Sequence, residues 1–335
     1  MNRRLGIFRL RPRIPIVALL LLLAAPLASA AQPMGKVAFL CPDGCSNLPN
    51  TVTDWDRAFL AGFERAGYVL GRNASIDMSG VGVGYDRLSA AAKKLVQRKV
   101  DVIVAVGNEA TWAARQATKS TPIVMVNVAD AVDEGLVASL GRPGANVTGL
   151  SVPLGQLAAK RIELLKEINP RLARVAVLWN PAIKLHQERF ARLERAVGSL
   201  GVQLSPLGVA TFRDLEKAFG SMGHGRPDGL LLFEPLMGPV RGEIALFALQ
   251  HRVVTAASDR FFVQGGGLLA YGPYLPDLYE RAALYAGKLL KGARPSELPV
   301  EEPTRFELIV NKATAKALGL TIPPSLLLRA DHLIE

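Results

Sequence analysis

The stretch VDVIVAVGNEAT, from Val100 to Thr111, indicates the fold of this chain. Its first part, Val100–Gly107, is an almost continuous apolar run of strand length, and a helical pattern follows from about residue 110 to 117. An apolar run without polar alternation is typical of a strand that is buried on both faces, as in a parallel sheet covered by helices. The stretch therefore predicts an α/β fold.

The same strand–helix unit recurs along the chain in two series. The first series has predicted strands over 36–40, 74–79, 100–107, 122–128 and 147–151, and helices over 53–66, 85–98 and 110–117. The second has predicted strands over 174–179, 202–207, 229–233, 253–257, 267–272 and 306–310, and helices over 154–168, 183–200, 215–222, 244–251, 278–290 and 312–318. Two series predict two doubly wound parallel-sheet lobes. Because ligands bind beyond the carboxyl ends of such strands, we expect a cleft between the lobes.

The first thirty residues have the pattern of a signal peptide. Five arginines precede an uncharged run from Ile14 to Ala31, which ends with Pro26 and the small residues Ala28–Ala30. This order predicts a cleaved secretory signal over residues 1–30, and an uncleaved membrane anchor is the alternative. We therefore expect the mature protein in the periplasm.

Charge and motifs exclude several classes of function. The chain has 40 basic and 29 acidic residues, and without the five leader arginines the balance is 35 against 29, with no basic run. This argues against nucleic-acid binding. The closest text to a dinucleotide fingerprint, SGVGVGYD, has the wrong glycine spacing, and no phosphate loop, G-x-S-x-G or H-E-x-x-H motif occurs. The sequence predicts no cofactor and no enzymatic activity.

Cys41 and Cys45 are the only cysteines, and they share one loop after the first predicted strand. Outside the cytoplasm two such thiols tend to oxidise to a disulfide. Free thiols remain an alternative, and a zinc site would need about four ligands. A disulfide beside the expected cleft is the favoured interpretation.

Polar residues after the predicted strands are the candidate ligand-binding residues. The helix start at 107–111 either binds a carboxylate with its free N–H groups or is a well-capped helix. Asp130 follows a strand and is placed to receive an ammonium group. These loops offer carboxylate and amide side chains and helix ends, but no pairing of a base with a nucleophile. This combination suggests binding rather than catalysis. The candidates are Gly107, Asn108, Glu109, Ala110, Thr111, Asp130, Asn180, Pro181, Glu234, Asp259 and Tyr271.

The phrases LVASLGRPGANVTGLS and KALGLTIPPSLLLRAD resemble those of the tryptophan/tyrosine-type ABC transporter substrate-binding proteins. The similarity runs from about Gly35 to the C-terminus. It implies the type I periplasmic-binding fold, with lobes over 31–149 plus about 275–300 and 150–272 plus about 303–335. It also implies three crossings between the lobes, with hinge residues Gly149, Ser151 and Gly272.

The resemblance implies a receptor that delivers a small solute, such as an amino acid, to an ABC permease in the inner membrane. The loop with Cys41 and Cys45 departs from the family, where this loop is usually rich in Ser and Gly, so a disulfide there would stiffen one wall of the cleft. Three alternatives remain at this point: a periplasmic receptor for a membrane signalling partner, an exported enzyme that uses the same cleft, and a transcriptional regulator with the same lobes. The last would need a helix-turn-helix where this chain has its leader.

Overall fold

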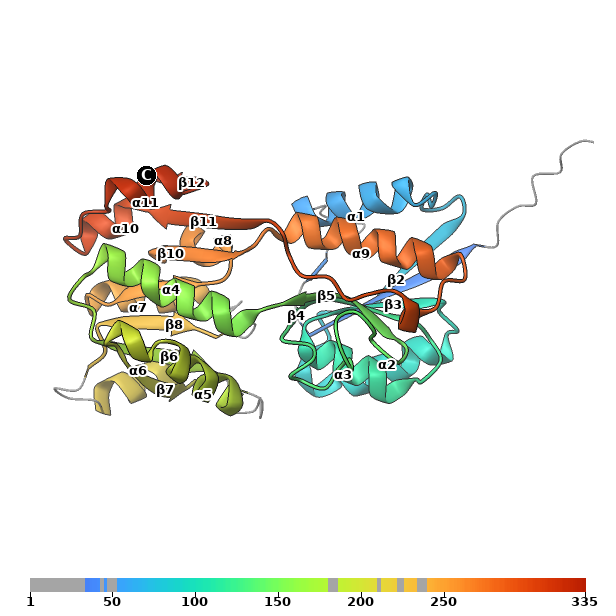
Figure 1. Ribbon diagram of the computed structural model, residues 1–335, viewed down its shortest axis with the longest axis horizontal. Coiled ribbons are helices and arrows are strands. Elements are labelled where there is room, and N and C mark those ends of the chain that lie inside the picture. The colour runs from blue at the N-terminus through green and yellow to red at the C-terminus, as the bar shows by residue number, and fades with distance from the viewer. Residues whose placement is uncertain are drawn as a thin grey trace, which may run out of the picture. The chain divides into compact units, whose positions relative to one another are not determined.

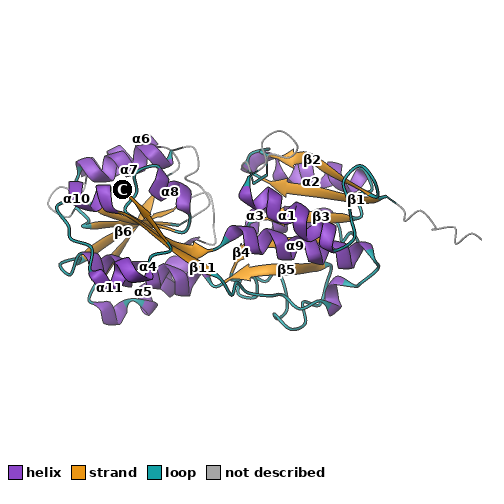
Figure 2. Cartoon of the chain, turned by 90° about the horizontal axis from the view of Figure 1, so that it is seen from above, coloured by secondary structure: helices purple, strands orange, loops and turns teal. Residues whose placement is uncertain are grey.

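Two separate β-sheets organise the chain, as Figures 1 and 2 show. The computed structural model describes residues 34–42, 45–46, 53–179, 186–209, 212–221, 226–233 and 240–335. The predicted signal peptide lies outside the described residues. Both sheets are mostly parallel and helices cover their faces, so the predicted α/β class is confirmed.

The first sheet has the strand order β2-β1-β3-β4-β5 and is parallel throughout. Its strands are β1 (Gly35–Cys41), β2 (Ala74–Val81), β3 (Val102–Val106), β4 (Ile123–Ala129) and β5 (Val147–Val152). Four helices pack on it: α1 (Asp54–Arg65), α2 (Leu88–Gln97), α3 (Asn108–Ala117) and α9 (Leu275–Leu290). We call this sheet and these helices the first lobe.

Alternate residues of β1 point to the two faces of the first sheet. Val37 and Phe39 pack with α1 and α9, which lie side by side in Figure 1. Ala38 and Leu40 pack on the other face, against α2 and α3. All four side chains are fully buried. A strand buried on both faces explains why the apolar run in the sequence shows no alternation.

The second sheet has the order β12-β11-β10-β9-β8-β6-β7. Its strands are β6 (Arg174–Trp179), β7 (Gln203–Gly208), β8 (Gly229–Leu232), β9 (Val254–Ala257), β10 (Leu269–Pro273), β11 (Phe306–Asn311) and β12 (His332–Ile334). Its helices are α4 (Leu154–Ile168), α5 (His186–Ala196), α6 (Phe212–Ser221), α7 (Arg241–Gln250), α8 (Arg260–Gln264), α10 (Lys312–Ala317) and α11 (Pro324–Arg329). We call this set the second lobe. The short elements α8, α11 and β12 were not predicted.

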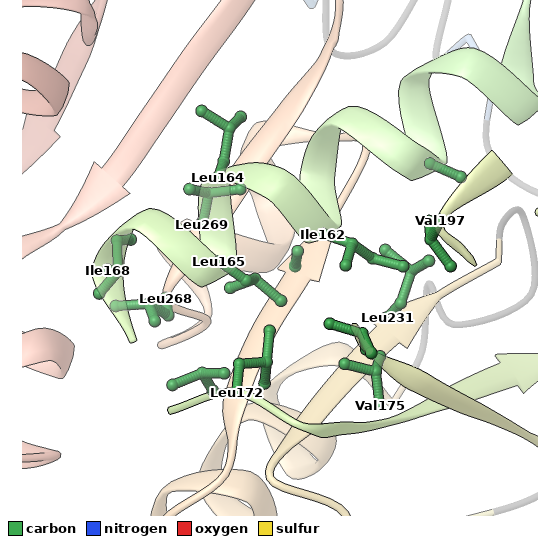
Figure 3. Packing of buried hydrophobic residues seen from close by; sticks show 14 of the residues in the cluster. Ile162, Leu164, Leu165, Ile168, Leu172, Val175, Val197, Leu231, Leu268 and Leu269 are labelled. Carbon is green, nitrogen blue, oxygen red and sulfur yellow. The ribbon is translucent and has the colours of Figure 1, made fainter. Parts of the chain in front are cut away.

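The core of the second lobe lies under α4, as Figure 3 shows. Ile162 and Leu165 of α4 pack toward Val175 of β6 and Leu231 of β8. The opposite face of the sheet is covered by α6, α7 and α8. The predicted covering of both faces is therefore present in this lobe as well.

Two strands, β11 and β12, depart from the predicted all-parallel arrangement: β12 is parallel to β11, and both run against the other strands of the second sheet. β11 runs antiparallel to β10, with Leu269 opposite Val310 and Pro273 opposite Phe306. The chain leaves β10 for α9 in the first lobe and returns at the same end of the sheet, where the Tyr274 N–H donates to the Arg305 carbonyl. A strand that re-enters at the end where its neighbour left runs in the opposite direction.

The chain passes between the lobes near the three predicted crossings. Gly149 of β5 has a φ of +126°, and a Cβ there would lie 2.2 Å from the Met125 carbonyl oxygen, so no other residue fits. Ser151 N–H donates to the Glu301 carbonyl, and Glu301 N–H donates to the Gly149 carbonyl, which ties the crossing at the end of β5 to the crossing before β11. At Gly272, a Cβ would lie 2.0 Å from the Ser258 carbonyl oxygen.

These contacts fit a hinge, but the hinge roles of Gly149, Ser151 and Gly272 stay a prediction. The predicted domain boundaries also stay a prediction, because contacts join residues 34–335 into one compact unit.

Candidate ligand-binding site

A cavity of about 670 Å³ lies at the carboxyl ends of the strands and is lined by both lobes. Cys41, Val106 and Asn127, at the ends of β1, β3 and β4, line it from the first lobe. Ser258 and Pro273, at the ends of β9 and β10, line it from the second. Pockets for small organic ligands hold about 300–1,000 Å³. Size and position therefore suit a small solute.

The start of α3 contains the five residues predicted to face the ligand. Gly107, Asn108 and Glu109 line the cavity, and Asn108, Ala110 and Thr111 are buried. The Asn108 side chain donates to the Ala129 carbonyl (2.8 Å) and accepts from the Ala129 N–H (2.9 Å). The Thr111 hydroxyl donates to the Gly107 carbonyl at 2.8 Å. Asn108 thus joins α3 to the end of β4, whereas Thr111 bonds within the first turn of its own helix.

Glu109 brings a carboxylate to the start of α3. Its Oε2 lies 4.0 Å from the position of a Cβ on Gly107, so the side chain folds back toward the helix end. Burial raises the pKa of Glu109, although a hydrogen bond from its own backbone N–H and the charge of Arg189 oppose the rise. The Glu109 carboxyl group therefore already lies at the electropositive helix end at which a ligand carboxylate was expected.

Asn127 lies at a β-bulge near the carboxyl end of β4. The register between β4 and β5 shifts between Met125 and Val128, and Asn127 has a φ of +52°. Its side chain is exposed and lines the cavity, while the other residues of β4 are buried. Bulges re-aim side chains, and a strained backbone of this kind clusters at ligand sites. Sequence reasoning missed Asn127, although an Asn inside a Val/Met run signals a residue that tolerates positive φ.

Cys41 and Cys45 form a disulfide in the cavity wall, as predicted. Tyr279 of α9 donates its hydroxyl to the Cys45 carbonyl at 2.8 Å. Burial and the charge of Asp56 raise the pKa of Tyr279. The disulfide loop therefore holds a tyrosine that also lines the cavity.

An aromatic group closes this side of the cavity. Trp55 packs against Tyr279 at 6.2 Å between ring centroids, and edge-on against Phe261 of the second lobe at 5.3 Å. Thr53 and Asp56 form a capping box at the start of α1, and this fixes the first turn that carries Trp55. The sequence analysis did not identify these aromatic residues as site residues.

Arginines dominate the wall formed by the second lobe. Arg260 pairs with Glu307 through Nη2 at 2.5 Å, and its Nη1 lies 3.9 Å from Asp54 of the first lobe. Asp259, a predicted site residue, lines the cavity and caps α8, and Arg241 lies 3.6 Å from it. Four arginines line this wall: Arg161, Arg189, Arg241 and Arg260.

Ion pairs join α5 of the second lobe to the loop after β4. Arg189 pairs with Glu134 at 3.0 Å, and both side chains are buried. Arg192 pairs with Asp133. Asp130, predicted to face the ligand, is not among the residues that line the cavity. Burial raises its pKa, and the charges of Arg192 and Arg189 oppose this, so Asp130 belongs electrostatically to the ion-pair group.

The remaining candidates lie elsewhere. Tyr271 is not among the lining residues; its carbonyl accepts from Nε of Arg161 at 2.7 Å and its ring stacks on Phe306. Asn180, Pro181 and Glu234 lie outside the described residues. Among the residues that the structure describes, no group of His, Cys, Asp and Glu side chains is arranged to hold a metal ion. No helix in the described part of the chain is long and apolar enough to cross a membrane.

Residues 55–334 match the family described as ABC transporter substrate binding protein. The chain belongs to this family. A tyrosine-binding protein of Clostridioides difficile is 28% identical over 265 residues, which cover 79% of this chain and 76% of that protein. The family resemblance found in the sequence is therefore confirmed.

Solved structures of similar fold agree with this assignment. An ABC domain from Streptococcus pneumonia in complex with L-Trp has a TM-score of 0.78 at 22% identity, and the match covers 90% of this chain and all of that one. A conserved domain protein from Vibrio cholerae also has a TM-score of 0.78, at 25% identity, with 90% and 99% covered. The two-lobed fold of periplasmic binding proteins is thus shared.

Proposed function

We propose that this chain is the exported solute receptor of an ABC importer, which closes its two lobes on an amino acid and presents it to a permease in the inner membrane. The observation that carries the proposal is the cavity at the strand ends, which both lobes line with charged and aromatic side chains. Family membership and a tyrosine-binding relative support an amino acid as the ligand.

The contacts across the cavity suggest how binding is coupled to closure. Trp55 of the first lobe contacts Phe261 of the second, and Glu134 of the first lobe pairs with Arg189 of the second. A ligand that touches both walls favours the closed arrangement by its difference in affinity for the two arrangements. We propose that the ligand is released to the permease without chemical change, after removal of residues 1–30 during export.

The test is a thermal-shift screen of the purified protein with the twenty amino acids, followed by titration calorimetry of each hit. A ligand at a hundred times its dissociation constant adds about 2.7 kcal/mol to the free energy of unfolding. We expect an aromatic amino acid to raise the melting temperature. If no amino acid binds while another class of solute does, the proposed ligand class is wrong.

Transport is tested separately by uptake of the labelled ligand in cells with and without the gene. The importer role predicts that uptake falls when the gene is deleted and returns with the gene on a plasmid. Unchanged uptake, together with binding in the calorimeter, would contradict the importer role and favour a signalling receptor.

A further inference from the structure

The ends of β3 and β4 present two polar side chains to the cavity, those of Glu109 and Asn127. Among the described residues, no ion pair holds the Glu109 carboxylate and no hydrogen bond holds the Asn127 amide. β3 and β4 are adjacent parallel strands, and Gly107 N–H donates to the Val126 carbonyl at 3.0 Å. Glu109 comes just after β3, and Asn127 lies near the end of β4. Both residues therefore lie at the same edge of the sheet, on neighbouring strands about 4.8 Å apart.

The two walls of the cavity differ in charge. Among the described lining residues, the second lobe contributes four arginines and the carboxylates Asp259 and Glu307. Three of these arginines take part in ion pairs: Arg189 with Glu134, Arg241 with Asp259 and Arg260 with Glu307. The first lobe contributes the carboxylates Asp54 and Glu109 and one arginine, Arg57, which pairs with Asp54. Glu109 is thus the first-lobe carboxylate in the cavity wall that takes part in no ion pair among the described residues. A zwitterion between these walls is oriented with its cationic end toward the first lobe.

The helix dipole of α3 does not reverse this orientation. A helix N-terminus corresponds to about half a positive charge, whereas an ionised carboxylate beside it, such as that of Glu109, carries one whole negative charge. The polar side chains of Asn108 and Thr111 are already bonded within the protein. The end of α3 therefore favours an ammonium group over a carboxylate.

We propose that Glu109 and Asn127 form the subsite for the α-ammonium group of the ligand, while the ligand carboxylate faces the arginines of the second lobe. This inference rests on the proposed function, because it takes the ligand to be an amino acid. Glu109 accepts the charge-assisted hydrogen bond, and the Asn127 amide oxygen accepts a second N–H. The left-handed backbone at Asn127 is what turns this amide into the cavity.

Titration calorimetry with matched ligands tests the subsite. The probes are L-tyrosine and L-tryptophan, their deaminated acids (hydroxyphenylpropanoate and indolepropanoate), and the amines tyramine and tryptamine. In the wild-type protein we expect loss of the amino group to weaken binding about 10- to 100-fold, the range for a hydrogen bond to a charged group. We expect Glu109→Gln to weaken binding of the amino acid by a similar factor and to leave binding of the deaminated acid unchanged.

Two further variants separate binding from folding. Asn127→Gly keeps a residue that tolerates positive φ and removes the amide, so we expect about 3- to 10-fold weaker binding of the amino acid without loss of stability. Glu64→Gln, at an exposed position of α1 outside the cavity, is the matched control and leaves binding unchanged. If Glu109→Gln does not fold, the subsite is tested by the affinity of Asn127→Gly for the amino acid and by the affinities of the wild type for the analogues.

The outcomes distinguish this inference from the proposed function. Wild-type protein that binds the deaminated acid as tightly as the amino acid contradicts the subsite but not the receptor. Equal weakening of both probes by Glu109→Gln assigns Glu109 a structural role and overturns the inference. If no amino acid or amine binds the wild type, the proposed ligand class fails and the inference fails with it.

Discussion

The ends of β3 and β4 are neighbours in the first sheet, yet they use their polar side chains differently. After β3, Asn108 and Thr111 bond to backbone groups of the protein. At the end of β4, Asn127 is exposed to the cavity and its backbone is strained. Two asparagines that look alike in sequence thus have different surroundings, because one is bonded within the scaffold and the other is exposed to the cavity.

This difference separates the rigidity of the site from its recognition of the ligand. A buried amide that replaces two backbone hydrogen bonds fixes the geometry of the cavity wall, and its removal should affect stability first. An exposed amide on a bulge adds little to stability, and its removal should affect affinity first. The following predictions test this separation, beginning with the largest expected effect.

Asn108→Ala should destabilise the protein by about 2 to 4 kcal/mol, because it leaves the buried N–H and C=O of Ala129 without partners. Urea unfolding monitored by circular dichroism measures the change. Glu64→Gln serves as the control and should stay within about 0.5 kcal/mol. A loss no larger than that of the control would mean that this amide does not hold α3 to β4.

Replacement of Cys41 and Cys45 together by Ser should cost about 2 kcal/mol, from the entropy of the short loop that the disulfide closes. Ligand affinity should also fall, because the Cys45 carbonyl that holds Tyr279 is no longer fixed. Unfolding and calorimetry are compared for the double variant and for wild type with and without reductant. Unchanged affinity in the double variant would show that the disulfide acts on stability alone.

The stability of the wild type should depend on pH through Glu109 in a way that Glu109→Gln removes. Burial raises the pKa of Glu109 in the folded protein, so the folded state binds the proton more tightly than the unfolded state does. The contribution is fully present below the usual Glu pKa of about 4.3 and is lost as pH rises through the raised value. The ligand-free variant should therefore gain stability relative to wild type as pH increases over this window. A pH-independent difference would contradict the burial of this carboxylate.

Asn127→Gly should change the free energy of unfolding by no more than about 0.5 kcal/mol, since glycine adopts the same positive φ without strain. Differential scanning calorimetry measures this against Asn127→Val, in which a β-branched side chain at positive φ should be clearly destabilising. Similar stability of the glycine and valine variants would mean that Asn127 does not need the left-handed backbone in solution.

The fold could be predicted because each buried strand is a Val/Ile/Leu run followed by a helical period. β6 and α4 have the predicted bounds, and the bounds of β3 and β4 differ by a few residues. The antiparallel β11 could not be predicted, because its direction depends on where the chain returns from α9 and not on its own residues. The short helix α8 is too short to show a helical period.

The site was predicted only in part, for a related reason. Loops after strands identified Gly107, Glu109, Asp259 and the disulfide, which all line the cavity. Arginines on helices, such as Arg161 and Arg189, cannot be told from solvated positions in the sequence, because their place in the cavity wall depends on how the helices pack. The bulge at Asn127 depends on pairing with β5, which local sequence does not specify.

The most direct measurement is a crystal structure of the protein with the amino acid that the screen identifies. We expect the ligand in the cavity, with its ammonium group within hydrogen-bond distance of Glu109 and Asn127 and its carboxylate toward the second lobe. A ligand bound with its carboxylate at the N–H groups of α3, or bound outside the cavity, would contradict it.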